Sequence, residues 1–240
     1  SLTRRLSLTA SRRHIVIPSS PETNMPVLLY NLVGSPPCGF IRCLAKEIGV
    51  ELNLRDLDLA KGEHRSEEFL KINPFHKVPT IDDNGFIVYE SNAIAYYLLR
   101  KYAPESDLYP TCIKTRTRID QALAAASGSI HPNLGTFFRP RYFQGTKPSP
   151  DEVKAFEENV LNSLEQLVGE NKFAVGDKIT IADLCLIGHV TVCLEVPCID
   201  KAKYPKLAAY YNRVKGALPY FEEIFGPVLV QINKVWEKLK

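Results

Sequence analysis

The sequence contains no long apolar run. Its most apolar stretch, residues 181–196, is interrupted by Asp183, His189 and Glu195. A membrane-spanning helix requires about 20 consecutive, predominantly apolar residues. We therefore expect no membrane-spanning segment and no membrane partner.

An excess of charge of one sign is also missing. The chain has 30 basic and 27 acidic residues, which gives a formal net charge of +3. Residues 1–24 contain four arginines and one glutamate, so the surplus lies there and the remaining chain is neutral in sum. Proteins that bind nucleic acid usually carry a strongly basic domain or stripe. We therefore expect no nucleic acid partner.

Cysteine pairs are scarce too. The six cysteines include no C-x-x-C pair and form no dense framework of the small secreted kind. Cys185 and Cys193 lie within an apolar helical pattern, which is typical of core thiols. No other His or Cys stands at metal-ligand spacing from His64 and His76. We expect a reducing compartment, a cytoplasmic location and no metal.

The chain does not begin with methionine, and its one methionine is Met25, directly before the first strand pattern. Residues 1–24 are rich in Arg and Ser, poor in acids, and lack the apolar segment of a signal peptide. We interpret them as a disordered or non-native leader without a folded role. Translated upstream sequence or a remnant of cloning is preferred over a transit peptide.

Residues 26–57 have the pattern of a strand, a helix and a second strand. A short apolar run over 27–30 suits a buried strand, and a Gly-Ser-Pro-Pro turn at 34–37 follows it. Apolar residues then recur at helical spacing up to Gly49, which is a stop signal. Residues 50–57 alternate apolar and polar side chains, which predicts a strand beside the first.

The next segment indicates a hairpin followed by a helix. A short helical stretch over 66–72 precedes two strands, 77–81 and 86–89, which flank the hairpin signal Asn84-Gly85. Ser91 is a good N-cap for the helical pattern after it. The combined order, βαβ-ββα, is that of a thioredoxin-like domain.

No strand pattern of comparable strength follows residue 110. Helical periodicity is present in five stretches: 113–134, 153–168, 181–194, 207–214 and, more weakly, 220–239. We predict an N-terminal thioredoxin-like domain over 25–103, a linker over 104–110 and an all-α helical-bundle domain over 111–240. Pro132 and Pro140 should break or kink the long first helix of that second domain.

Ser35 lies where the first strand turns into the first helix. The free amides and partial positive charge of a helix N-terminus favour a bound anion there. A serine hydroxyl is a poor nucleophile, but it is a good donor to a thiolate and can lower the pKa of the thiol. A plain helix cap is the alternative.

Cys38 is the rival reactive group, because Ser35-Pro36-Pro37-Cys38 has the spacing of a redox C-x-x-C. The attacking sulfur of such motifs is normally the first one. Its absence here argues against disulfide exchange.

Three further places could bind a peptide. Val78-Pro79 suggests a cis proline that offers the Val78 backbone to an extended chain, with an ordinary strand-start proline as the alternative. Glu90-Ser91 could receive a carboxylate on the serine and helix amides and an ammonium on the glutamate, or simply cap the helix. We interpret His64 and His76 as donors to a second carboxylate, with a surface role as the alternative.

Short motifs occur in order from about Met25 into the helical region. They are Leu29-Tyr30, Ser35-Pro36-Pro37-Cys38, Gly62-Glu63-His64, NPFHKVPT from Asn73 to Thr80, Asp82-Asp83-Asn84-Gly85, Glu90-Ser91-Asn92-Ala93-Ile94, Leu108-Tyr109-Pro110 and ITIADL from Ile179 to Leu184. The ordered set is specific, and it resembles the glutathione transferases, in particular the arthropod delta and epsilon classes. In the last motif the family has a capping box, a folding element made by Thr180 and Asp183.

The resemblance implies that Ser35 is the catalytic serine, which hydrogen-bonds the glutathione sulfur. It also implies that seven residues surround the tripeptide: His64, His76, Lys77, Val78, Glu90, Ser91 and Asn92. Glutathione would be a co-substrate, and no cofactor would be tightly bound. A homodimer is expected from the resemblance alone.

In such proteins the hydrophobic substrate lies between the serine loop and the long first helices of the second domain. The residues expected there are Pro36, His131, Leu134, Phe138, Tyr142 and Phe143, with Phe137 beside them and Val228, Leu229 and Trp236 as lids. An aromatic stripe at helical spacing is more often core, which is the alternative. Gly135 departs from the pattern, since several relatives have an arginine there, and so does Ala126, where an acidic residue is common.

We therefore predict a glutathione S-transferase that joins the thiolate of reduced glutathione to hydrophobic electrophiles in detoxification and xenobiotic metabolism. Peroxide reduction or dehydrohalogenation are expected as side activities. One rival interpretation is a non-catalytic protein on the same fold that binds hydrophobic ligands or serves as a structural module. The other is a glutaredoxin-like oxidoreductase that works through Cys38.

Overall fold

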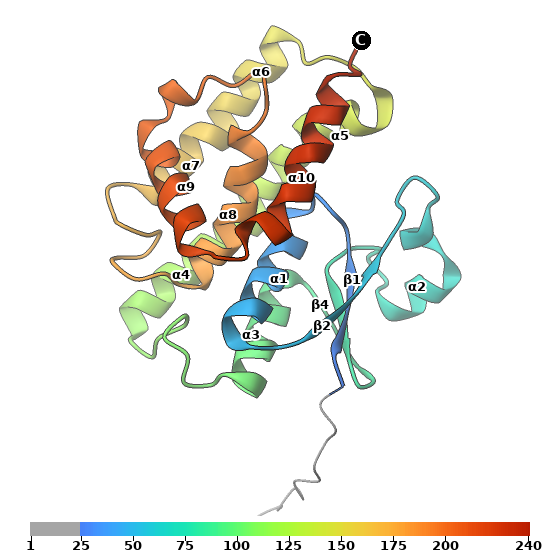
Figure 1. Ribbon diagram of the computed structural model, residues 1–240, viewed down its shortest axis with the longest axis vertical. Helices are drawn as coiled ribbons and strands as arrows, with labels where there is room; N and C mark the ends of the chain where they lie inside the picture. Colours follow the sequence, from blue (N-terminus) through green and yellow to red (C-terminus); the bar gives the residue numbers. More distant parts are fainter. Residues whose placement is uncertain (1–24) are drawn as a thin grey trace, which may run out of the picture.

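A computed structural model describes residues 25–240, and the interpretation of residues 1–24 as a leader lies outside them (Figure 1). The first part of the described chain contains a four-stranded sheet in the order β2-β1-β3-β4. Its strands are β1 Val27–Asn31, β2 Leu52–Asp56, β3 Thr80–Asp83 and β4 Phe86–Tyr89. β1 and β2 are parallel, whereas β3 is antiparallel to β1 and to β4.

Helices cover the sheet and make up the second part of the chain. Those with the sheet are α1 Pro36–Ile48, the 3-10 helix η1 Glu63–Arg65, α2 Glu67–Ile72 and α3 Ser91–Tyr102. Those of the second part are α4 Ile113–Ala125, the π-helix η2 Ala126–Ile130, α5 His131–Gln144, α6 Pro150–Phe156, the π-helix η3 Glu157–Leu161, α7 Asn162–Val168, α8 Ile181–Leu194, the 3-10 helix η4 Lys201–Lys203, α9 Pro205–Ala217 and α10 Phe221–Trp236. Figure 1 shows α1 and α3 between the sheet and the second part, with α2 on the opposite side. The predicted fold class, a thioredoxin-like βαβ-ββα domain followed by an all-α domain, is confirmed.

Local sequence signals set the bounds of α1 and of the hairpin. Ser35 caps α1, and Gly49 ends it in the left-handed conformation at φ 70°. Asn84 and Gly85 both have positive φ, 55° and 90°, as the tight turn between two twisted strands requires.

The start of α3 differs from the expectation by one residue. Glu90, not Ser91, occupies the cap position, with φ 69°. Glu90 therefore turns the chain from β4 into the helix, and Ser91 is already helical.

The long helix through α4 and α5 does not break at its prolines. The π-helical turn η2 lies directly before His131, and Pro132 occupies the first turn of α5. Proline cannot donate a hydrogen bond to the preceding turn, so the helix widens where that donor is missing. Pro140 lies inside α5, which continues to Gln144.

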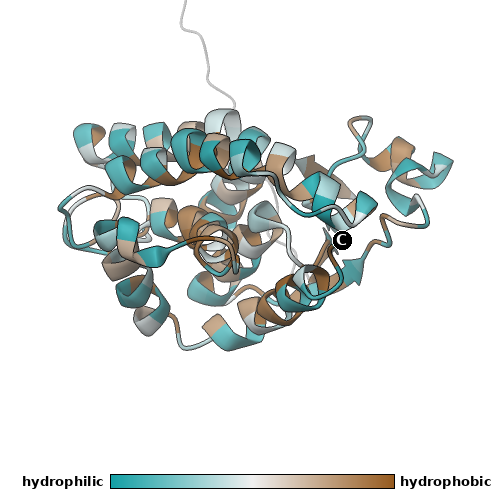
Figure 2. Cartoon of the chain, turned by 90° about the horizontal axis from the view of Figure 1, so that it is seen from above, coloured by the Kyte–Doolittle hydropathy of each residue, from teal (hydrophilic) through white to brown (hydrophobic). Residues whose placement is uncertain are grey.

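Helix α8 is the buried centre of the second part, since each of its residues is buried. The expected capping box at its start is present: the Thr180 amide donates to Asp183 Oδ2 at 2.8 Å. Asp183 Oδ1 also accepts hydrogen bonds from the Ala174 amide at 2.7 Å and the Tyr210 hydroxyl at 2.9 Å. Figure 2 shows that the helices around α8 turn their hydrophobic faces inward and their hydrophilic faces outward. Within residues 25–240 no helix is both long and apolar enough to cross a bilayer.

The six cysteines are free thiols in two groups. Four are buried, Cys38, Cys43, Cys185 and Cys193, and two are exposed, Cys112 and Cys198. Burial raises the pKa of Cys38 to about 11 and that of Cys185 to about 12. The pKa values of Cys43 and Cys193 are raised by burial as well. The buried thiols are therefore neutral near pH 7.

Candidate active site

The candidate site is built on the turn between β1 and α1. Ser35 has an extended backbone, φ −81° and ψ 114°, and its Oγ accepts a hydrogen bond from the Cys38 amide at 3.4 Å. Ser35 is half-buried at the N-terminus of α1. The first turn of α1 contains no acidic side chain, so the positive end of this helix is not neutralised.

Cys38 lies in the same turn but is turned into the core. Its side chain is 1% exposed, and burial holds the pKa of its thiol well above the ordinary range, at about 11. A thiol must ionise and be accessible to attack a disulfide. The geometry therefore opposes the glutaredoxin-like interpretation.

Two helices of the second domain close over the Ser35 turn. A Cβ on Gly188 of α8 would lie 3.1 Å from both the Cα and the carbonyl oxygen of Pro36, and a Cβ on Gly39 would lie 2.9 Å from the ring of Phe225 in α10. A cavity of about 10 Å³ remains between them, and its lining includes Ser35, Pro36, Gly39, Gly188 and Val228. The two glycines thus permit a close contact that fixes the serine turn against the helical domain.

Replacing Gly188 with alanine is expected to displace the Ser35 turn. The added methyl group would meet backbone atoms of Pro36, and overpacking of this kind costs about 1–2 kcal/mol. Urea unfolding should show this loss of stability, and the rate of glutathione conjugation to a chloronitrobenzene should show a lower kcat. Gly216→Ala in α9 is the matched control, because its Cβ would meet nothing within 4 Å. Equal stability and activity of the two variants would contradict the proposed contact.

Basic side chains gather in the loop between η1 and β3. His64 belongs to η1, and His76 follows in the loop with φ 54°. Burial lowers the pKa of His64, and the charges of Arg65, His76 and Lys77 lower it further. Its Nδ1 atom is enclosed and has no hydrogen-bond partner in the described part of the chain. The loop therefore offers several donors and positive charge to an anionic ligand.

The backbone of this loop is held by a residue to which the sequence analysis assigned no role. The Asn73 amide donates to the Lys77 carbonyl and to Thr80 Oγ1, both at 3.0 Å. The Val78-Pro79 peptide bond is cis, in agreement with the sequence-based suggestion. Buried asparagine is a signal that the NPFHKVPT motif contains, but its partners follow only from the fold.

The three residues predicted at the start of α3 face different groups. Glu90 and Ser91 lie at the turn from β4 into the helix. The Asn92 amide instead donates to the Leu123 carbonyl of α4 at 3.4 Å. Its Oδ1 is enclosed and receives no hydrogen bond from residues 25–240.

The residues predicted for the electrophile pocket separate into buried and exposed groups. Leu134 and Phe138 are buried, and the Phe138 ring packs against Phe156 and Trp236 with centroid distances of 6.0 and 5.7 Å. The ring centroids of Tyr142 and Phe138 are 6.1 Å apart. Phe143, in contrast, is 64% exposed to solvent. Trp236, expected as a lid, thus packs in an aromatic cluster between α5, α6 and α10.

His131 forms a pair with His189 of α8, which the sequence analysis treated only as an interruption of an apolar run. The two ring centroids are 5.5 Å apart, edge to face. His189 Nδ1 donates to the Cys185 carbonyl at 2.9 Å, a role that the acceptor dictates. Burial lowers the pKa of His131, and the charges of Arg139 and Lys77 lower it further.

Acid pH is expected to destabilise the protein through His189. Burial first, and the neighbouring His131 second, lower the pKa of His189 to about 3 in the folded chain. An unfolded histidine has a pKa of about 6.5. Below that value the unfolded state takes up a proton that the folded state excludes, so stability falls as the pH falls from about 6.5 toward about 3. Between about pH 7.5 and about pH 5 the loss is about 2 kcal/mol.

Urea unfolding at both pH values, for the wild type and for His189→Asn, measures this contribution. Asparagine can still donate to the Cys185 carbonyl but does not titrate. Groups that titrate elsewhere contribute equally to both proteins, so the wild type should lose about 2 kcal/mol more than the variant. Equal losses would contradict the role of His189.

Gly135, one of the departures noted in the sequence, has a structural counterpart. The guanidinium of Arg139, one helical turn later, folds back over it, and a Cβ on Gly135 would lie 3.6 Å from Arg139 Nε and Nη2. The missing side chain thus leaves room for a cation from the next turn.

Two family models match the chain. The one described as "Glutathione S-transferase, N-terminal domain" matches residues 25–100, and the one described as "Glutathione S-transferase, C-terminal domain" matches residues 119–216. The chain belongs to the glutathione transferase family. Proteins of this family use glutathione as a substrate.

Solved structures of insect glutathione transferases are similar over most of the chain. A delta-class enzyme from Nilaparvata lugens is 33% identical with a TM-score of 0.79, and the match covers 88% of this chain and 99% of that one. An epsilon-class enzyme from the housefly Musca domestica is 31% identical with a TM-score of 0.80, and the match covers 88% and 98%. A glutathione transferase homologue from Drosophila mojavensis, solved with bound glutathione, is 28% identical with a TM-score of 0.80, covering 89% and 98%. The resemblance to the delta and epsilon classes is confirmed.

Proposed function

We propose that this glutathione transferase family member is an active enzyme that conjugates reduced glutathione to hydrophobic electrophiles. The observation that carries the proposal is the Ser35 hydroxyl, which lies half-buried at the N-terminus of α1, where no acidic side chain in the first turn offsets the positive end of the helix. Such a group donates to a thiolate and thereby lowers the pKa of the thiol.

Glutathione binds extended over the first domain in this proposal. His64 and His76 donate hydrogen bonds to one carboxylate and Lys77 supplies positive charge, while the Val78 backbone before the cis proline pairs with the peptide. Ser91 and the first amides of α3 receive the second carboxylate, and Glu90 receives the ammonium group. Asn92 supports this corner from its contact with α4.

The thiol proton of glutathione leaves to solvent, and the thiolate attacks an electrophilic carbon. The C–S bond of the thioether forms as the bond to the leaving group breaks, and that group departs with the bonding electron pair, as chloride does from a chloronitrobenzene. Pro36, His131, Leu134, Phe138, Tyr142 and Phe143 are proposed to surround the electrophile. Holding both reactants together supplies proximity, which can be worth several kcal/mol of the barrier. A homodimer, a cytoplasmic location, a role in detoxification, and peroxide reduction or dehydrohalogenation as side activities belong to the same proposal.

The test is capture on immobilised glutathione followed by the rate of conjugation with a chloronitrobenzene as a function of pH. Turnover that rises with pH through one ionisation supports the proposal. Capture without turnover across a panel of electrophiles would replace it with the binding-protein interpretation.

A further inference from the structure

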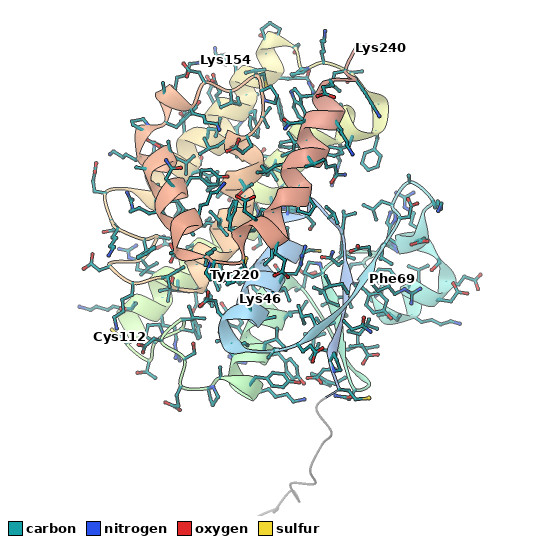
Figure 3. All side chains as sticks on the ribbon, in the orientation of Figure 1. Lys46, Phe69, Cys112, Lys154, Tyr220 and Lys240 are labelled. Carbon is teal, nitrogen blue, oxygen red and sulfur yellow. The ribbon has the colours of Figure 1, made fainter. Side chains whose placement is uncertain are left out.

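Helix α10 contacts α1 at its own first residues and the serine turn further along. At its start, Lys46 pairs with Glu223 at 2.8 Å, and the Tyr220 hydroxyl donates to Glu47 at 2.5 Å. Figure 3 shows Tyr220 and Lys46 close together where the two helices meet. The beginning of α10 is therefore fixed to the last turns of α1.

Further along α10, one face approaches the serine turn step by step. The ring of Phe225 covers Gly39, and Val228 lines the small cavity together with Ser35. One turn later comes Gln231: a Cβ on Gly34 would lie only 3.0 Å from Gln231 Oε1. Since Gly34 immediately precedes Ser35, this face of α10 ends on the backbone beside the catalytic serine.

Gln231 is the polar member of this face, and the oxygen of its side-chain amide has no hydrogen-bond partner in the described part of the chain. Its Oε1 atom is enclosed, yet no donor within residues 25–240 reaches it. Enclosed polar atoms in proteins nearly always have a partner, and leaving one unpaired costs free energy. The NH₂ group of the same amide has no acceptor among residues 25–240 and is not enclosed, so it can donate to a ligand without moving the oxygen.

We propose that Gln231 is a second residue of the thiol site, whose amide donates a hydrogen bond to the glutathione thiolate beside the one from Ser35. This inference rests on the proposed function. Donation favours the thiolate over the thiol, so Gln231 lowers the pKa of the bound thiol, and the released proton goes to solvent. A Gly at position 34, with φ 90°, is what lets a side chain from α10 approach so closely.

The test compares Gln231→Leu with Gln231→Asn, Gln231→Glu and the control Val230→Ala, whose side chain is 53% exposed on the neighbouring face. The readouts are the pH profile of kcat/KM and the ultraviolet absorbance of the bound thiolate against pH. Gln231→Leu should raise the pKa of the bound thiol by about 0.7 and lower kcat/KM about fivefold near pH 6.5, with a deficit that shrinks at alkaline pH. Gln231→Glu, with a like charge beside the thiolate, should raise that pKa further, and Val230→Ala should leave it unchanged.

A thiol pKa in Gln231→Leu equal to that of the wild type would overturn the inference, because a merely structural role would change stability without moving the pKa. If leucine prevents folding, Gln231→Asn and Gln231→Glu keep the test decisive, since they retain polarity and must still move the thiol pKa. Failure of the proposed function would give a different result: either the wild type has no conjugation activity, or Ser35→Ala has the same activity and thiol pKa as the wild type.

Discussion

Replacing Ser35 with alanine is expected to lower kcat/KM for conjugation about 30-fold near pH 6.5, because the thiolate loses a charge-assisted hydrogen bond worth about 2 kcal/mol. The same loss raises the pKa of the bound thiol by about 1.5. The deficit in rate should therefore shrink once the pH exceeds the new pKa. Glutathione affinity should change little, since the peptide contacts lie elsewhere.

Cys38→Ala is the matched control for this experiment, because Cys38 lies in the same turn. Its thiol is buried and neutral, so its removal should leave the pH profile unchanged. The result that would reverse the assignment is full activity in Ser35→Ala together with loss of activity in Cys38→Ala. That result would restore the oxidoreductase interpretation.

Asp183→Asn is expected to have the largest effect on stability. The aspartate accepts hydrogen bonds from the Thr180 amide, the Ala174 amide and the Tyr210 hydroxyl at the start of the wholly buried α8. An amide nitrogen would face at least one of these donors and leave it unpaired, at a cost of about 3 kcal/mol. For a chain of this size that corresponds to a fall in Tm of roughly 6–12 °C.

Thermal and urea unfolding check this value, and Ser149→Ala provides the comparison. Ser149 and Glu152 form the same capping box at the start of α6, but at the surface, where losing the cap costs about 1 kcal/mol. If both substitutions cost the same, burial of the Asp183 network contributes nothing beyond ordinary capping.

Features that depend on neighbouring residues in the sequence could be predicted. Ser35 and Gly49 bound α1 because capping and the left-handed stop are properties of a single turn of backbone. Asn84-Gly85 and the Thr180–Asp183 box are equally local. For the same reason the order of strands and helices could be derived before any tertiary contact was known.

Features that depend on contacts between residues far apart in the sequence could not be predicted. Gln231 stands almost 200 positions after Gly34, and only the docking of α10 brings them together. The π-helical turn before Pro132 results from a missing donor inside a helix that stays continuous because it packs on α8. Burial of His189 likewise follows from the position of α8 at the centre of the domain.

The burial of four cysteines affects how readily electrophilic substrates would alkylate the protein itself. Alkylation of a cysteine depends on access and on the fraction of thiolate. Cys38, Cys43, Cys185 and Cys193 offer neither, because they are enclosed and their pKa values are raised. In the proposed reaction, an electrophile at the serine turn therefore meets the ionised sulfur of glutathione and not the neutral, enclosed thiols of the four buried cysteines. Under the proposed function, we expect electrophiles to alkylate the exposed Cys112 and Cys198 first and to leave the buried cysteines unmodified.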